Sequence, residues 1–83
     1  MEIRQIQTFV QAARLGSFSK AAEMLGYSQS AVTVQIRLLE TELDTRLFDR
    51  MGKKISLTPQ GVRFLEHSNR ILYEMERTMF SMR

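Results

Sequence analysis

Apolar residues recur at helical spacing at the start of the chain. Ile3, Ile6, Phe9, Val10 and Ala13 fall on one face of a helix with a period of about 3.6 residues. The pattern ends at Gly16, a residue type that commonly follows the last turn of a helix. We therefore predict a first amphipathic helix over residues 2–15, with its apolar face turned toward the core.

A short helix and a longer one follow. The segment Ser17-Phe18-Ser19 offers a hydroxyl N-cap to a run of good helix formers that stops at Gly26. Only Tyr27 separates this glycine from Ser28, which is the predicted N-cap of a third helix from residue 29 to about residue 43. Two helices joined by so tight a turn must cross steeply, which is the geometry of a helix-turn-helix.

The third helix has two unlike faces. Its predicted buried stripe consists of Val32, Ile36, Leu39 and Leu43, flanked by Ala31 and Leu38. The opposite face carries small or hydrogen-bonding side chains with a single cation: Ser30, Thr33, Val34, Arg37 and Thr41, with Gln29 at the first turn. An ordinary solvated helix surface is instead dominated by Glu and Lys.

The helical spacing of apolar residues ends at Asp44. Aspartate can take the left-handed conformation that the end of a helix often needs. Residues 47–50 and 55–57 resemble two short strands joined by a Gly-containing hairpin, which gives a β-hairpin wing over about residues 46–57. Thr58 as N-cap and Pro59 at the first helical position then predict a long helix to residue 82. The predicted fold is mainly α: a winged helix-turn-helix of three helices and a two-stranded wing, followed by a linker helix.

The long helix would measure about 36 Å, more than one small core can bury. We expect its first half, with Val62, Phe64 and Leu65, to pack on its own domain and the remainder to project. Its alternating apolar steps are typical of a coiled-coil seam. The predicted dimer interface comprises Leu65, Ser68, Leu72, Met75, Met79 and Met82. Its partner would be a second copy of the chain, or a domain outside it.

Composition narrows the class of protein. Eighty-three residues, 43% hydrophobic and 25% charged, suit one small folded domain. The chain contains no cysteine, which excludes disulfides and thiolate sites and suits a reducing compartment. No apolar run approaches the roughly 20 residues of a membrane helix, and no signal peptide opens the chain.

The net charge of +3 is concentrated in one segment. Residues 45–63 hold five basic residues and one acidic residue, a net of +4, and the stretch from Met24 to Leu39 contains no acid. Considered alone, such a charge run is usually a solvated face. Beside an acid-free helix surface it favours a polyanionic partner.

The chain also resembles a family, the amino-terminal DNA-binding domains of LysR-type transcriptional regulators. The matching segments include Phe9 with Ala13, residues 16–22, Leu25, residues 28–32, Gln35-Ile36, Leu39-Glu40, Leu43, residues 47–50 and residues 57–61. The resemblance implies that residues 1–58 are a DNA-binding domain, with the helix-turn-helix over about 18–37, and that residues 59–83 are a linker helix that dimerises. It also implies an effector-binding domain that is absent from this chain.

Roles for individual residues follow from the same resemblance. It implies base reading in the major groove by Gln29, Ser30, Thr33 and Val34. It implies phosphate contacts from Ser17, Ser19, Lys20, Ser28, Gln35 and Arg37, although Gln35 lies near the buried flank and has a structural alternative. The wing residues would be Arg50, Lys53 and Lys54. The chain departs from the family at Val34, where a larger polar or basic residue is common, and at Ser30, where proline is frequent.

Three alternatives compete with a DNA-binding domain of this family. Catalysis is disfavoured because His67, the single histidine, has no carboxylate three or four residues away, and no phosphate loop is present. A winged helix used only for protein contacts would carry acids on the third helix and no basic hairpin. Another winged-helix family would not be expected to combine the segment at 47–50 with the Thr58-Pro59 helix start.

The resulting hypothesis is a bacterial, cytoplasmic and nucleoid-associated regulator that is not an enzyme. We expect a homodimer, joined through the linker helix, on an imperfect inverted repeat of double-stranded DNA. A small-molecule effector would bind only through the absent domain. We expect no cofactor, no metal and no membrane contact for this segment.

Overall fold

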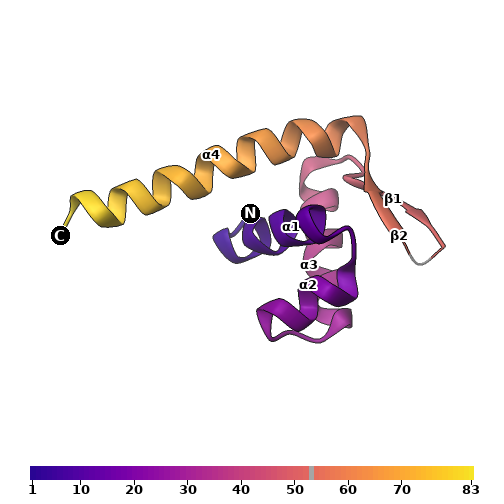
Figure 1. Ribbon diagram of the computed structural model, residues 1–83. Helices are drawn as coiled ribbons and strands as arrows, with labels where there is room; N and C mark the ends of the chain where they lie inside the picture. Colours follow the sequence, from indigo (N-terminus) through magenta and orange to yellow (C-terminus); the bar gives the residue numbers. More distant parts are fainter. Residues whose placement is uncertain (53) are drawn as a thin grey trace.

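The computed structural model describes residues 1–52 and 54–83 and confirms the winged helix-turn-helix with a long terminal helix (Figure 1). The elements are α1 (Ile3–Leu15), α2 (Phe18–Leu25), α3 (Gln29–Leu43), β1 (Phe48–Met51), β2 (Lys54–Leu57) and α4 (Pro59–Ser81). Each predicted helix and strand is present, and the bounds differ from the predictions by at most two residues.

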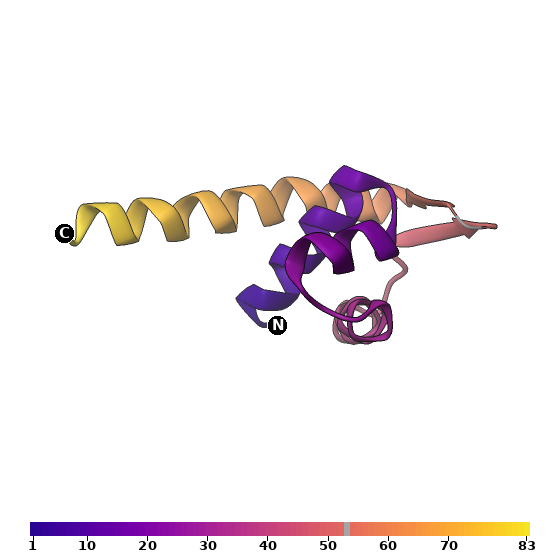
Figure 2. The same ribbon diagram turned by 60° about the horizontal axis from the view of Figure 1, so that its bottom comes forward.

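Local signals in the sequence account for most helix ends. The side chain of Ser17 accepts a hydrogen bond from the backbone N–H of Lys20 and caps α2. Gly26 ends α2 with a φ of 76°, in the left-handed region that a glycine adopts without steric cost. Ser28 then caps α3 by accepting from the N–H of Ala31. The two helices joined by this short turn cross steeply. In Figure 2, α2 runs across the view while α3 is seen end-on.

The core is built around Phe9 of α1, which is fully buried. Its ring centre lies 5.3 Å from that of Phe48 in β1 and 4.8 Å from that of Phe64 in α4. The predicted stripe of α3 is confirmed for Val32, Ile36 and Leu39, which are all buried, and Leu43 packs against them. Leu38 differs from the prediction, since it is 51% exposed and does not flank the core closely.

The backbone conformation of Asp44 and a hydrogen bond to the backbone of Leu47 position the segment between α3 and the wing. Asp44 adopts a φ of 51° at the end of α3, as predicted. The Glu40 carboxylate accepts a hydrogen bond from the backbone N–H of Leu47 at 2.8 Å. This bond fixes the position of the chain between α3 and β1. It therefore helps to set the direction in which the wing extends from the helices.

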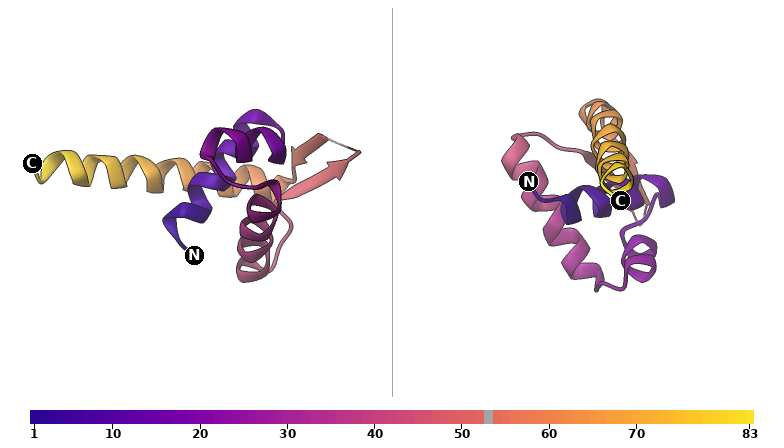
Figure 3. Two further views of the ribbon diagram at one scale, coloured as in Figure 1. Left: turned by 90° about the horizontal axis from the view of Figure 1, so that it is seen from below. Right: turned by 90° about the vertical axis from the view of Figure 1, so that its left-hand side faces the viewer.

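The wing is a two-stranded antiparallel hairpin in which Phe48 pairs with Leu57 and Arg50 pairs with Ile55. Lys53, a predicted wing residue, lies outside the described residues. The hairpin extends away from the body at the end opposite the C-terminus (Figure 3). Phe48 anchors the wing in the core, and Ile55 and Leu57 of the second strand pack against the same cluster.

Helix α4 lies alongside α1 and then projects, which gives the molecule a long axis of 45 Å (Figures 1 and 3). Phe64 is buried and Leu65 half-buried against the core, as predicted. The prediction for Val62 is wrong, because this side chain is 47% exposed. Within the described residues no helix is both long and apolar enough to span a membrane.

The face of α4 that carries the predicted dimer interface is partly used within the chain. Ser68 is fully buried, so its predicted role in contacting another copy is wrong. Leu65 and Leu72 pack against the core, and Met75 lines a hollow together with Val10 of α1 and Leu25 of α2. Helix α1 therefore covers more of α4 than the sequence predicted. Beyond that cover Met79 and Met82 are exposed, and an interface there stays a prediction.

Candidate nucleic-acid interface

The start of α2 presents polar groups at the surface. Ser19 and Lys20 are exposed, and the hydroxyl of Ser19 lies 3.0 Å from that of Ser17. Phe18, between the two serines, is buried. The free N–H groups of the first helical turn and the positive end of the helix dipole share this surface, so it suits an anion such as a phosphate.

The start of α3 repeats this arrangement. The hydroxyls of Ser28 and Ser30 lie 3.1 Å apart, and Gln29 is exposed between them. One turn further along, the hydroxyl of Thr33 donates to the carbonyl oxygen of Gln29, and Val34 is exposed. Thus three of the four predicted base-reading residues are exposed and Thr33 is half-buried.

The wing brings a cation to the same region. The guanidinium carbon of Arg50 lies 5.2 Å from the ring centre of Phe18, within the range of a cation–π contact. Phe18 itself meets Phe48 of the wing edge-on, with ring centres 5.3 Å apart. Arg50 is therefore held over the start of α2. The sequence offered no signal for this contact, because the two residues belong to elements far apart along the chain.

These elements enclose a hollow of about 400 Å³. Its lining comes from the start of α2, the start of α3 and the wing: Ser17, Phe18, Ser19, Gln29, Arg50, Gly52 and Ile55. The structure thus brings together predicted phosphate, base-reading and wing residues. Phe18, Gly52 and Ile55 join them without having been predicted as site residues.

Other predicted residues lie apart from this hollow. Arg37 is exposed further along α3, where it lines a separate depression with Thr41 and Arg46. Lys54 is exposed in the wing, opposite Met51. Both face solvent, and their contacts with phosphates stay predictions.

Gln35 has a partner inside the protein. Its side-chain oxygen lies 2.5 Å from the hydroxyl of the buried Thr8, and that hydroxyl is also 2.9 Å from the carbonyl oxygen of Arg4. Since a hydroxyl carries one proton, both contacts are satisfied if Thr8 donates to Arg4 and the amide of Gln35 turns to donate to Thr8. Gln35 thus joins α3 to α1, the structural role that its place near the buried flank suggested.

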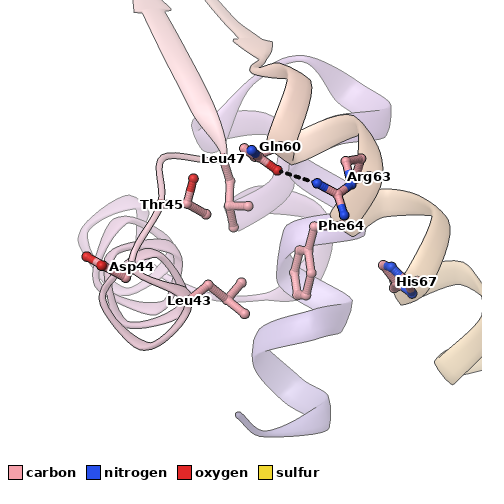
Figure 4. A pocket seen from close by; sticks show the side chains of 8 residues that line it. All are labelled: Leu43, Asp44, Thr45, Leu47, Gln60, Arg63, Phe64 and His67. Carbon is pink, nitrogen blue, oxygen red and sulfur yellow. Dashed lines mark hydrogen bonds between the residues drawn. The ribbon is translucent and has the colours of Figure 1, made fainter.

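A second hollow of about 370 Å³ lies between the end of α3 and the start of α4 (Figure 4). Leu43, Leu47 and Phe64 form its apolar wall, and His67 lies at its edge. Asp44 is the one acidic residue of its lining and points away from the histidine. Across residues 1–52 and 54–83, no three His, Cys, Asp or Glu side chains are grouped as metal ligands.

Comparison with known proteins agrees with this geometry. The family described as "Bacterial regulatory helix-turn-helix protein, lysR family" matches residues 3–62. The HTH-type transcriptional regulator GltR of Bacillus subtilis (strain 168) is 44% identical over 82 residues, which cover 99% of this chain and 28% of GltR. The chain spans about a quarter of the length of most of the curated relatives it matches.

Solved structures are similar over nearly the whole chain. The DNA-binding domain of CbnR, in a complex with DNA, superposes with a TM-score of 0.95 at 36% identity, covering 99% of this chain and 94% of that one. The corresponding domain of BenM, in a complex with catB site 1 DNA, gives 0.91 at 34% identity, covering 99% and 90%. From its sequence and its fold, the chain belongs to the lysR family of bacterial regulatory helix-turn-helix proteins.

Proposed function

We propose that this chain is the DNA-binding part of a transcriptional regulator and binds double-stranded DNA sequence-specifically. The observation that carries the proposal is the convergence of the starts of α2 and α3 with Arg50 on one hollow. Two helix N-termini and a guanidinium there offer donors and positive charge without an acidic side chain in the lining. That the similar CbnR and BenM domains were solved with DNA supports the same assignment.

In this proposal α3 enters the major groove and its first two turns meet the base edges. The exposed amide of Gln29 suits an adenine edge, and the exposed Ser30 hydroxyl suits several bases. Ser17, Ser19, Lys20 and Ser28 contact phosphates at the two helix starts, and Arg37 contacts one further along the groove. Arg50 and the wing lysines meet the backbone or the minor groove.

We further propose that two copies pair through the projecting part of α4. The exposed apolar residues Met79, Phe80 and Met82 lie beyond the cover of α1, and bare apolar surface on a projecting helix favours association. Pairing would place two α3 helices on the halves of an inverted repeat.

The rest of the hypothesis concerns the whole regulator. We propose that it acts in the bacterial cytoplasm on the nucleoid, without catalysis, and that this segment needs no cofactor. A small-molecule effector would act through a separate domain. The curated relatives, named as transcriptional regulators, support a regulatory role.

Salt dependence tests the DNA interface. A duplex selected from a random pool should bind with an affinity that falls steeply between 50 and 200 mM salt, roughly 10³-fold or more if six phosphates are contacted. Lys54→Ala should lower the slope of log affinity against log salt by about one, because one phosphate contact is lost. The matched control is Arg70→Ala, which removes an equal charge from the exposed surface of α4.

Two results would contradict this interface. One is the failure to select any duplex at low salt. The other is an equal loss of slope in the Lys54 and Arg70 variants, because net charge alone would then explain binding.

Sedimentation tests the pairing. Met79→Lys with Met82→Lys should shift the protein from dimer to monomer, whereas Ser81→Lys, on another side of α4, should not. An unchanged sedimentation coefficient in the double variant would refute an interface at the end of α4.

A further inference from the structure

Part of the hydrogen-bonding capacity on the exposed face of α3 is already used within the helix. The hydroxyl proton of Thr33 is already donated to the carbonyl oxygen of Gln29, at 3.1 Å. The hydroxyls of Ser28 and Ser30 are paired with each other, at 3.1 Å. Near the middle of this face stands Val34, with 48% of its surface exposed. A solvent-exposed valine in the second turn contributes nothing to the core, which leaves its apolar surface available to a ligand.

The chemistry of the major groove limits what this side chain can meet. Base edges there present nitrogen and oxygen acceptors, amino donors and one apolar substituent, the C5-methyl group of thymine. An isopropyl group cannot hydrogen-bond, so a donor or acceptor placed against Val34 would lose its water without gaining a partner. The methyl group is the one substituent that gains from the contact.

We propose that Val34 makes this domain a reader of a pyrimidine C5-methyl group, so that one thymine in each half-site is recognised through its methyl. This inference rests on the proposed function, since it requires α3 to lie in the major groove. It also implies that 5-methylcytosine is bound more tightly than cytosine at the same position.

Leu38 provides a built-in comparison. It is as exposed as Val34, at 51%, and follows it by one turn. In a helix-turn-helix the N-terminal residues of the recognition helix contact the bases, and Leu38 lies in the third turn of α3. Replacing Leu38 therefore removes a similar exposed apolar side chain that lies outside the first two turns of α3, the turns that contact the bases. It serves as the control for Val34.

The experiment uses a selected duplex in which each thymine is replaced in turn by deoxyuridine. This change removes one methyl group and leaves base pairing intact. Burial of a methyl-sized group corresponds to about a fourfold change in affinity, so one position per half-site should weaken binding about fourfold. At that position a 5-methylcytosine–guanine pair should bind about fourfold more tightly than a cytosine–guanine pair.

The variants assign the effect to one side chain. Val34→Ala, at an exposed helical position that tolerates alanine, removes most of the apolar surface and should lower both ratios, and Leu38→Ala should leave them unchanged. Indifference to deoxyuridine at every position, or an undiminished response in Val34→Ala, would overturn methyl reading. Salt-dependent, sequence-selective binding would survive either result, so the proposed function would stand. Failure to select any duplex would overturn both.

Discussion

Gly61 of α4 lies against the backbone of Leu47 so closely that a β-carbon at this position would overlap the carbonyl oxygen of Leu47. The same oxygen accepts a hydrogen bond from the N–H of Thr58, at 3.0 Å. The Thr58 hydroxyl in turn donates to the carbonyl of Arg46, and its oxygen accepts from the N–H of Gly61 at 2.9 Å. Gly61 is thus required by lack of space, and it allows α4 to begin directly on the segment that leads into the wing.

Gly61→Ala should therefore destabilise the protein. Helix propensity alone would favour alanine by about 1 kcal/mol. The overlapping atom belongs to the backbone and cannot rotate away, so we expect a net loss of about 2 kcal/mol in the free energy of unfolding, measured with urea. Asn69→Ala, at an exposed position of the same helix, should change stability by less than about 0.5 kcal/mol. A neutral Gly61→Ala variant would mean that the two segments do not meet this closely.

Ser68→Ala should stabilise the protein. The hydroxyl oxygen of Ser68 is buried without a hydrogen-bond partner among the described residues, and such a group costs about 1–3 kcal/mol. We expect a gain of about 1 kcal/mol in the free energy of unfolding, and little change from Ser81→Ala at the exposed end of α4. A loss of stability in Ser68→Ala would contradict an unsatisfied hydroxyl at this position.

The bond between Gln35 and Thr8 can be separated from DNA binding. Gln35→Ala and Thr8→Val should each lower the free energy of unfolding by about 1–2 kcal/mol, because each leaves a buried polar group or a gap. The double variant should lose less than the sum of the two, which a double-mutant cycle measures. Because the Gln35 amide is uncharged, its loss leaves the salt slope unchanged in either case, and affinity at one salt concentration is the test. A structural Gln35 predicts that Gln35→Ala binds all duplexes as before, whereas a uniform loss of affinity across sequences would establish the predicted phosphate contact.

Asp44 is a site where stability can be improved. It combines a positive φ of 51° with a negative charge at the negative end of α3. Asp44→Gly should raise the free energy of unfolding by about 1 kcal/mol, since glycine adopts this conformation freely. Asp44→Asn, which removes the charge and keeps the conformation, should gain about 0.5 kcal/mol. This electrostatic gain is present in both variants and should diminish in high salt, whereas the conformational gain from glycine should not. Thermal unfolding at two salt concentrations would show both effects, and a destabilised Asp44→Gly variant would contradict them.

The sequence predicted much of the candidate interface as well as the fold. Exposure of Gln29, Ser30 and Val34 followed from the helical period of α3, because an apolar stripe on one side leaves the opposite side in water. The period did not predict the exposure of Leu38, at the margin of the stripe, because exposure there depends on what packs beside the helix.

The sequence by itself determined where the helices begin and end, because caps and turns depend on neighbouring residues: Ser17, Ser28 and Thr58 start helices, and Gly26 and Asp44 end them. Only the tertiary structure decided which side chains meet across elements. It placed Arg50 over Phe18 and buried Ser68 within the chain, where a periodic pattern had predicted a dimer interface. A periodic pattern shows that a face is apolar, but what covers the face depends on how the elements pack together.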